Sequence, residues 1–270
     1  MWRFFCLQMQ KSLSPRIGVF DSGIGGLTVL KSLQQRLPEA HFVYYADSQN
    51  APYGALDGGT LLAYSERIVQ YLIRREVDLI VVACNTVTTE VIDQLRALYP
   101  LPFVGIEPAI KPATRGAQNK SIGVLATART LQSKGYQRTR DEYAKSFKVI
   151  ERPGIGLVEE IEKGVFDSPE LIRLVQSFVD DFERQPIDTL VLGCTHYILI
   201  KPLFERLFAT PVTLLDANEA VARRTQEIAK PAEEVFQMVE CYTSGSTELL
   251  EAVVKHLDIA FVRSIEALTL

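Results

Sequence analysis

Short runs of β-branched residues alternate along the chain with longer stretches whose apolar residues recur at three- and four-residue spacings. The short runs predict buried strands, and the longer stretches predict amphipathic helices. The expected strands are Ile17–Asp21, Phe42–Ala46, Leu79–Ala83, Phe103–Gly105, Ile122–Ala126, Thr189–Leu192 and Val212–Leu215. The expected helices are Leu27–Leu37, Leu61–Arg75, Val87–Leu98, Leu131–Lys145, Pro169–Arg184 and Ile198–Phe208. This alternation predicts an α/β fold with mostly parallel sheets covered by helices on both faces.

The two halves of this pattern resemble each other. The segment DLIVVACNT, which begins at Asp78, resembles DTLVLGCTH, which begins at Asp188, 110 residues later. In the same way IGVFDS at Ile17 resembles IGVLAT at Ile122, 105 residues later. We therefore expect two similar Rossmann-like lobes. Because ligands of parallel sheets bind at the carboxyl ends of the strands, we expect the active site in the cleft between the lobes.

Composition narrows the ligands that such a protein could bind. The 270 residues are 47% apolar and 23% charged, which is enough chain for one large or two small cores. No apolar run approaches the ~18 residues of a membrane span. The net charge of −4 lacks the basic excess that nucleic-acid binding requires. The possible ligands that remain are small molecules and protein partners, and we expect binding to neither nucleic acid nor a membrane.

The four cysteines are too few for a disulfide framework, and no two form a C-x-x-C pair that would suggest a structural zinc site. The first residues do not read as a secretory signal, so we expect a cytoplasmic chain with reduced thiols. We assign no role to Cys6, which lies in an expected N-terminal tail.

Two of the cysteines stand at matching strand ends in the two halves. Cys84 is followed by Asn85 and Thr86, and Cys194 is followed by Thr195 and His196. A buried structural cysteine needs no such polar successors, so a functional interpretation is favoured. A cysteine hydrolase would leave one of the two thiols unused. Racemisation uses both, because one thiolate removes a proton from one face of Cα while the opposing thiol protonates the other.

The sequence DSGIGG, from Asp21 to Gly26, follows a strand and opens a helix, but it matches neither a dinucleotide fingerprint nor a P-loop. Amide groups at such a turn favour a carboxylate, and Asp21 by itself is equally consistent with a helix cap. Of the three histidines only His196 adjoins a cysteine, which favours a role in proton transfer. No Schiff-base lysine or metal-ligand cluster is evident, so we expect neither cofactor nor metal.

Four motifs in this order resemble bacterial glutamate racemase, a cofactor-independent family of the aspartate/glutamate racemase superfamily. They are DSGIGG at 21–26, APYG at 51–54, ACNT at 83–86 and GCTHY at 193–197, and their order and spacing match from Ile17 to Ala222. The resemblance implies that the second lobe is inserted within the first. The domains would be a tail at 1–15, a first lobe at 16–107 plus 216–270, and a second lobe at 108–215.

The resemblance also implies an activity and a set of site residues. The activity would be the interconversion of L- and D-glutamate, which supplies D-glutamate for peptidoglycan synthesis. The protein would be a homodimer. Cys84 and Cys194 would be the two bases, with Asp21 assisting the first thiol and His196 the second. Substrate contacts would come from Asp21, Ser22, Tyr53, Gly54, Asn85, Thr86, Thr127, Thr195 and His196.

The resemblance further implies that a glutamate assists Cys194. The family pattern points to Glu162, two residues before a glycine, with Glu159 and Glu160 as competitors. Before this segment the chain reads Arg152-Pro-Gly, where many relatives have a cysteine beside the proline.

Two other functions compete with this interpretation. One is an aspartate racemase or another amino-acid racemase of the superfamily. Aspartate racemases usually carry Glu after the second Cys-Thr, where this chain has His196. The other is a two-lobed binding protein that has lost catalysis. The presence of both cysteines argues against this second function.

Overall fold

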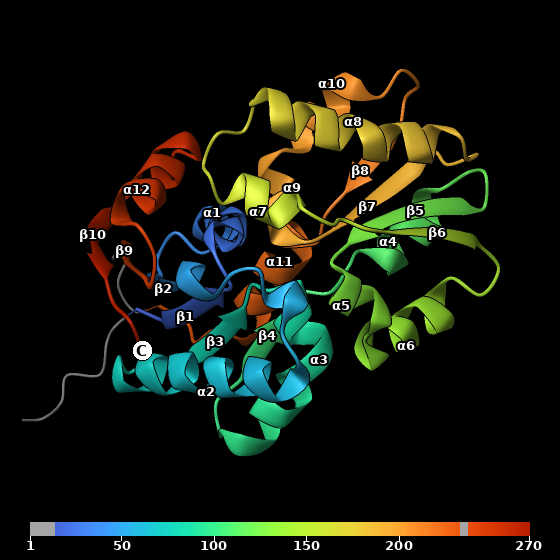
Figure 1. Cartoon of the computed structure of the whole chain (residues 1–270). Helices are drawn as coiled ribbons and strands as arrows, with labels where there is room; N and C mark the ends of the chain where they lie inside the picture. Colours follow the sequence, from blue (N-terminus) through green and yellow to red (C-terminus); the bar gives the residue numbers. More distant parts are fainter. Residues whose placement is uncertain (1–13, 233–236) are drawn as a thin grey trace, which may run out of the picture.

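A computed structural model describes residues 14–232 and 237–270, which form two parallel sheets (Figure 1). Cys6 lies outside the described residues. The first sheet has the order β10-β9-β2-β1-β3-β4, and the second has the order β6-β5-β7-β8. The strands are β1 (Arg16–Asp21), β2 (His41–Ala46), β3 (Leu79–Val82), β4 (Phe103–Gly105), β5 (Ser121–Ala126), β6 (Lys148–Pro153), β7 (Thr189–Gly193), β8 (Thr213–Leu215), β9 (Met238–Thr243) and β10 (Val262–Ala267).

Twelve α-helices connect and cover these strands within the described ranges. They are α1 (Leu27–Arg36), α2 (Gly58–Arg74), α3 (Asn85–Leu98), α4 (Ile110–Gly116), α5 (Ala128–Gln132), α6 (Lys134–Tyr143), α7 (Leu157–Ile161), α8 (Pro169–Glu183), α9 (Thr195–Leu199), α10 (Lys201–Leu207), α11 (Asn218–Ile228) and α12 (Thr247–His256). Three short 3₁₀ turns, η1 (Ile24–Gly26), η2 (Ser48–Asn50) and η3 (Tyr53–Ala55), follow the ends of β1 and β2.

The path of the chain makes the molecule two-lobed, as the sequence predicts. The chain builds β1 to β4 of the six-stranded sheet, crosses to build all four strands of the second sheet, and then returns for β9 and β10. We call the six-stranded sheet with its helices the first lobe and the four-stranded sheet with its helices the second lobe. The exact domain boundaries given above stay a prediction.

All seven predicted strands are present, and three further strands were missed. The missed strands are β6, β9 and β10. β6 and β10 lie at sheet edges and contain charged residues, so neither forms an apolar run. β9 lies between β2 and β10, but Glu240 interrupts its apolar sequence. A pattern search tuned to uniformly apolar parallel strands does not detect such segments.

Two predicted helices are each divided into two. The helix expected at 131–145 breaks at Ser133, whose hydroxyl accepts a hydrogen bond from the Tyr136 amide at 3.2 Å and so caps α6. The helix expected at 198–208 breaks before Lys201, because Pro202 has no N–H to continue the helical hydrogen bonds. The short helices α4 and α7 give too few turns for a periodic pattern, and α12 was also missed.

The apolar residues of both sheets form a core that is continuous across the lobes. One cluster joins Val19 of β1 to Val124 of β5 and Leu190 of β7. A second cluster lies on the opposite face of the first sheet, where Phe20 packs with residues of α2 and α3. Val19 and Phe20 are neighbours in β1, so their side chains point to opposite faces and serve different clusters.

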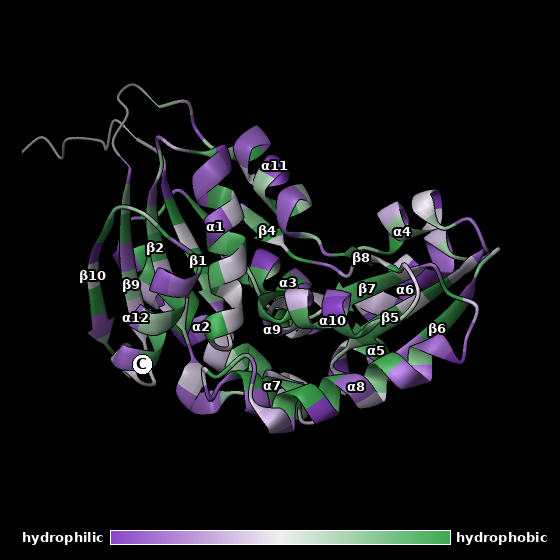
Figure 2. Cartoon of the chain, turned by 90° about the horizontal axis from the view of Figure 1, so that it is seen from above, coloured by the Kyte–Doolittle hydropathy of each residue, from purple (hydrophilic) through white to green (hydrophobic). Residues whose placement is uncertain are grey.

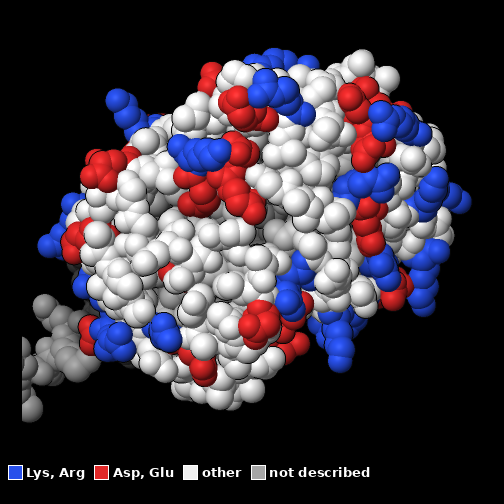
Figure 3. Space-filling model, in the orientation of Figure 1, with Lys and Arg blue, Asp and Glu red and all other residues white. Residues whose placement is uncertain are grey.

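The helices are amphipathic, and the surface is mixed in charge. Figure 2 shows α8 banded in hydrophobic and hydrophilic colours, and its buried residues recur at helical spacing: Leu171, Val175, Val179 and Phe182. On the face drawn in Figure 3, acidic and basic side chains are interspersed. No helix within 14–232 or 237–270 combines the length and apolar character needed to cross a membrane.

A buried carboxylate joins the amino ends of several strands in the first lobe. Glu240 of β9 lies 3.6 Å from Arg16 of β1 and 2.9 Å from His41 of β2, pairs with Arg75 after α2, and accepts a hydrogen bond from Tyr242 at 2.9 Å. Burial and nearby arginines lower the pKa of His41 to about 4, so the imidazole is neutral at pH 7. The arginines therefore supply the countercharge.

We expect Glu240→Ala to destabilise the protein by about 1–3 kcal/mol, because it leaves the partly buried guanidinium groups of Arg16 and Arg75 without their partner. Urea unfolding followed by circular dichroism measures this loss. The matched control is Glu205→Ala on α10, an exposed carboxylate whose removal should change stability by less than about 0.5 kcal/mol. Equal effects of the two substitutions would show that the Glu240 cluster does not stabilise the fold.

Candidate active site

The polar residues expected at the site lie at the carboxyl ends of strands in both sheets. Asp21 ends β1, and Cys84 follows β3 by two residues. In the second lobe Thr127 follows β5 and Cys194 follows β7 directly. Since the strands within each sheet are parallel, these ends share one edge.

Hydrogen bonds between the lobes bring these two edges together. The Thr195 hydroxyl donates to Oδ2 of Asp21 at 3.1 Å, and the hydroxyls of Thr86 and Thr127 lie 3.0 Å apart. Each bond joins a residue of one lobe to a residue of the other. The expected site residues therefore lie between the lobes.

Asp21 is fully buried and is both a cap and part of the site. Its Oδ2 accepts a hydrogen bond from the Gly26 amide at 2.6 Å, which closes the DSGIGG turn, as well as the bond from Thr195. The Ser22 hydroxyl lies 3.4 Å from its other oxygen. Burial raises the pKa of Asp21, although His196 and hydrogen bonds from the Ser22 backbone and the Thr195 hydroxyl oppose the shift. The carboxyl is thus a better proton acceptor than an exposed aspartate.

The Cys84 sulfur is buried at the start of α3. Its Sγ lies 3.7 Å from the Ser22 hydroxyl. Burial raises the pKa of the Cys84 thiol, and the negative charge of Asp21 raises it further. The charge of Cys194 adds to the same upward shift. Without substrate, Cys84 is a protonated thiol at neutral pH.

The surroundings of Cys194 are different, because it has a histidine and a glutamate beside it. Its Sγ lies 3.8 Å from Nδ1 of His196, and Nε2 of His196 lies 2.5 Å from Oε1 of Glu162. Burial by itself lowers the pKa of His196, but the contacts with Cys194 and Glu162 outweigh it and raise the pKa. The arrangement therefore favours an imidazolium next to the sulfur.

Of the three candidate glutamates, only Glu162 contacts this histidine. Glu160 pairs with Lys163 at 2.6 Å, and Glu159 is exposed. Glu162 Oε1 also accepts the Ile24 amide hydrogen at 2.8 Å, which ties it to η1 in the first lobe. Gly23 makes this approach possible, since a Cβ there would overlap Glu162 Oε1 and lie 2.9 Å from His196 Nε2.

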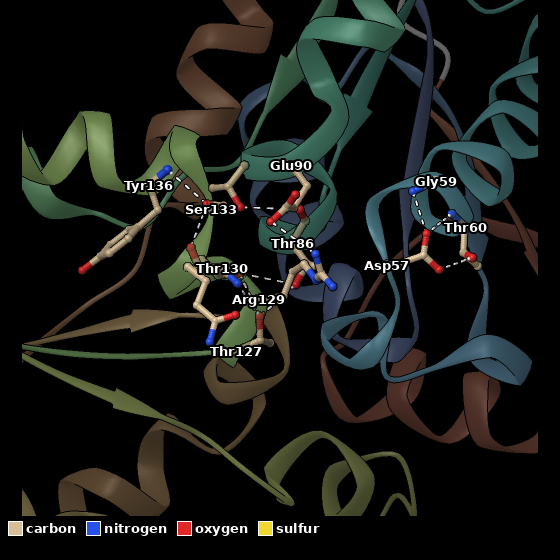
Figure 4. A network of polar contacts seen from close by, with 12 residues as sticks. Asp57, Gly59, Thr60, Thr86, Glu90, Thr127, Arg129, Thr130, Ser133 and Tyr136 are labelled. Atoms are coloured by element: carbon tan, nitrogen blue, oxygen red, sulfur yellow. Dashed lines mark hydrogen bonds and ion pairs between the residues drawn. The ribbon is translucent and has the colours of Figure 1, made fainter.

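A group of threonines lies between α3 and α5 (Figure 4). The Thr130 hydroxyl accepts a hydrogen bond from the Thr127 hydroxyl at 2.9 Å and lies 3.4 Å from the Thr86 hydroxyl. The Thr130 amide donates to the Thr127 hydroxyl at 3.1 Å. Next to them Arg129 lies 3.8 Å from Glu90, another pair between the lobes. Thr130, Arg129 and Glu90 were not among the expected site residues. The T-x-x-T spacing of a capped helix start is the one signal that could have indicated Thr130.

The remaining expected contacts are near the site, but two have side chains engaged elsewhere. The Tyr53 hydroxyl donates to Asp47 at 2.5 Å, and the Asn85 amide donates to the Ile106 carbonyl at 3.3 Å. Gly54 lies against Thr127 across the lobes. Asp47, which was not expected, is thus the partner that orients Tyr53. Within the described ranges no group of three or more His, Cys, Asp or Glu residues could hold a metal ion.

Each of the two parallel sheets has one buried thiol at its carboxyl edge, and each thiol has an acid–base residue beside it. This arrangement is typical of an α/β protein that transfers protons on a small molecule. The chain belongs to the Asp/Glu/Hydantoin racemase family, whose model matches residues 25–225.

Among its relatives are proteins named glutamate racemase. That of Ectopseudomonas mendocina is 39% identical over 250 residues, covering 91% of this chain and 95% of the relative. That of Halothermothrix orenii is 36% identical over 250 residues, covering 90% and 98%.

Solved structures agree with these relatives. Escherichia coli glutamate racemase, in complex with L-glutamate and the activator UDP-MurNAc-Ala, has a TM-score of 0.85 and 29% identity, covering 95% of this chain and 98% of that one. Picrophilus torridus aspartate racemase has a TM-score of 0.56 at 18% identity over 79% of this chain, a likeness of fold alone.

We expect Asp21→Asn to lower the pKa of Cys84, because it removes the carboxylate charge that disfavours the thiolate. The measurement is the ultraviolet thiolate absorbance as a function of pH, with Cys84→Ala as the control that identifies the Cys84 signal. In Asp21→Asn the Cys84 thiolate should form at lower pH than in the wild type. An unchanged titration would mean that Asp21 does not act on this thiol electrostatically.

Proposed function

We propose that this protein interconverts L- and D-glutamate, with Cys84 and Cys194 as the two acid–base groups and no cofactor. The observation that carries the proposal is the pair of buried thiols at matching strand ends of the two lobes. The glutamate racemases among the relatives match nearly the full length of the chain, which supports glutamate as the substrate. The D-glutamate formed would serve peptidoglycan synthesis.

The reaction is a proton transfer at Cα in two balanced halves. One cysteine thiolate takes the Cα proton and becomes a thiol, which leaves a carbanion on the substrate. The other cysteine, as a thiol, donates its proton to the opposite face and becomes a thiolate. The configuration at Cα is thereby inverted, and the reverse reaction exchanges the two roles. Acid–base groups held against the reacting atom supply this kind of rate enhancement.

The two thiols reach the thiolate form by different means. A protonated imidazole beside a sulfur favours the thiolate, so His196 assists Cys194, and Glu162 keeps the ring in place. Asp21 cannot lower the pKa of Cys84 by its charge. Its raised pKa suits it instead to accept a proton, and its carboxylate suits it to hold the substrate ammonium group, whose positive charge would favour the Cys84 thiolate.

Neutral donors suit the two substrate carboxylates. Hydroxyl and amide groups that can donate hydrogen bonds are gathered at the site: Ser22, Asn85, Thr86, Thr127 and Thr195. We assign the carboxylates of glutamate to these donors, with Tyr53 and Gly54 forming the adjoining wall. The assignment of each contact rests on the motif match and on the closeness of these residues.

We expect Cys84→Ala and Cys194→Ala each to lower racemisation by at least about 10³-fold in both directions, because each removes an essential acid or base. The matched control is Cys241→Ala, which removes a buried thiol on β9 and should retain activity. Circular dichroism with each glutamate enantiomer measures the rates. Activity near the wild-type level in either of the first two variants would rule out the two-thiol mechanism.

Deuterium incorporation distinguishes catalysis from binding and one substrate from another. In heavy water the wild type should place deuterium at Cα of glutamate, with no added cofactor and in the presence of a chelator, and should leave aspartate unlabelled. A binding protein would label neither amino acid, and an aspartate racemase would label aspartate.

Asp21→Asn and His196→Asn should affect the two directions unequally, with opposite preferences, because each residue serves a different thiol. The equilibrium constant fixes the ratio of kcat/KM values, so the difference must appear in kcat and KM separately. Full kinetics in both directions measure it. Equal losses of kcat in both directions for both variants would contradict the assignment of Asp21 to Cys84 and of His196 to Cys194.

The quaternary structure and location are further parts of the proposal. We expect a homodimer in the cytoplasm, as the family resemblance implies. Light scattering on the purified protein measures its mass in solution, and a single-chain mass of 30.2 kDa would contradict the dimer.

A further inference from the structure

The segment that follows the Glu162 side chain makes a tight turn toward the first lobe. Glu162 stands at the end of α7, and the Gly164 amide donates to the Ile161 carbonyl at 2.9 Å. Gly164 has φ +76°, in the left-handed region that favours glycine. We call residues Glu162–Phe166, which lead from α7 toward α8, the Glu162 strap.

The strap rests on α12, which lies in the first lobe beside β10 (Figure 1). Leu249 of α12 occupies the space that a Cβ at Gly164 would need. At the far end of the strap, the rings of Phe166 and His256 have centroids 5.2 Å apart and are inclined at 54°. The strap therefore contacts α12 at two points, two and four residues after Glu162.

Glu162 is thus held from two directions by the first lobe, although α7 belongs to the second. Its carboxylate accepts the Ile24 amide hydrogen at 2.8 Å, and its own backbone continues into a turn fixed on α12. The same carboxylate oxygen lies 2.5 Å from His196. A displacement of the strap would weaken the contact between Glu162 and His196 before it disturbed Cys84, whose sulfur has Ser22 as its neighbour.

We propose that α12, through Leu249 and His256, positions Glu162 against His196, so that His256 is a positioning residue for the half of the reaction that uses Cys194. The role of the site in racemisation rests on the proposed function; the contact between α12 and the strap does not. His256 is exposed and lies outside the core clusters, so its side chain can be changed without removing packing from the sheets.

The test compares His256→Ala with Glu162→Gln in both reaction directions. His256→Ala should lower kcat about threefold to tenfold more in one direction than in the other, since only part of a hydrogen bond is lost. The favoured direction should be the same as in Glu162→Gln. In the Glu162→Gln background, His256→Ala should add no further asymmetry, because its effect passes through Glu162.

Two variants separate positioning from a general effect on the fold. His256→Phe keeps a ring against Phe166 and should restore the wild-type balance of kcat values. Lys255→Ala changes the neighbouring exposed residue of α12, whose side chain forms no hydrogen bond or ion pair with the strap, and should leave both directions unchanged. Equal losses in both directions, or an asymmetry that persists in the Glu162→Gln background, would overturn the proposal.

A second measurement does not depend on turnover. The protein has only three histidines, so their imidazole signals can be resolved by NMR of ¹⁵N-labelled protein. Each signal is assigned by its loss in the corresponding His→Gln variant. In His256→Ala the His196 titration should move to lower pH, because Glu162 no longer stabilises the imidazolium fully. An unchanged His196 titration overturns the positioning role. If the wild type fails to racemise glutamate, the proposed function fails, while this titration still tests the position of Glu162.

Discussion

The buried carboxylate of Asp21 is the interaction on which the geometry between the lobes depends. A carboxylate removed from water is costly unless hydrogen bonds replace its hydration. Asp21 obtains one such bond from the Gly26 amide in its own turn and another from Thr195 in the opposite lobe. The residue that shapes the DSGIGG turn therefore also fixes the start of α9, which carries Thr195 and His196 directly after Cys194.

The two buried thiols differ in their electrostatic environments. At Cys84 the negative charge of Asp21 adds to burial and makes the thiol harder to ionise. Beside Cys194, His196 supplies a positive charge, and the Glu162 carboxylate holds that imidazolium in place. A reaction that runs in both directions does not require equal surroundings, because each thiol must only be able to give and take one proton. The difference between the two sides is what makes directional kinetics informative for this protein.

The continuous core explains how small side-chain contacts can control this site. The apolar cluster that includes Val19, Val124 and Leu190 spans both sheets, so the lobes meet over packed side chains as well as over polar groups. Close-packed interiors transmit small displacements because they have little free volume. Packing therefore sets the distance between the lobes at which polar contacts such as Thr86–Thr127 and Ile24–Glu162 form.

The sequence by itself determined the α/β class, the seven apolar strands and the two cysteine-bearing strand ends, because buried parallel strands and strand-end motifs are local patterns. It did not reveal β9, since Glu240 within it is compatible with a strand only when Arg16 and Arg75 come from elsewhere in the chain. It could not choose among Glu159, Glu160 and Glu162 either. That choice depends on the turn at Gly164 and on the approach of Ile24, 138 residues away in sequence. Contacts between distant segments decide which of several equivalent side chains reaches the site, and only the tertiary structure contains them.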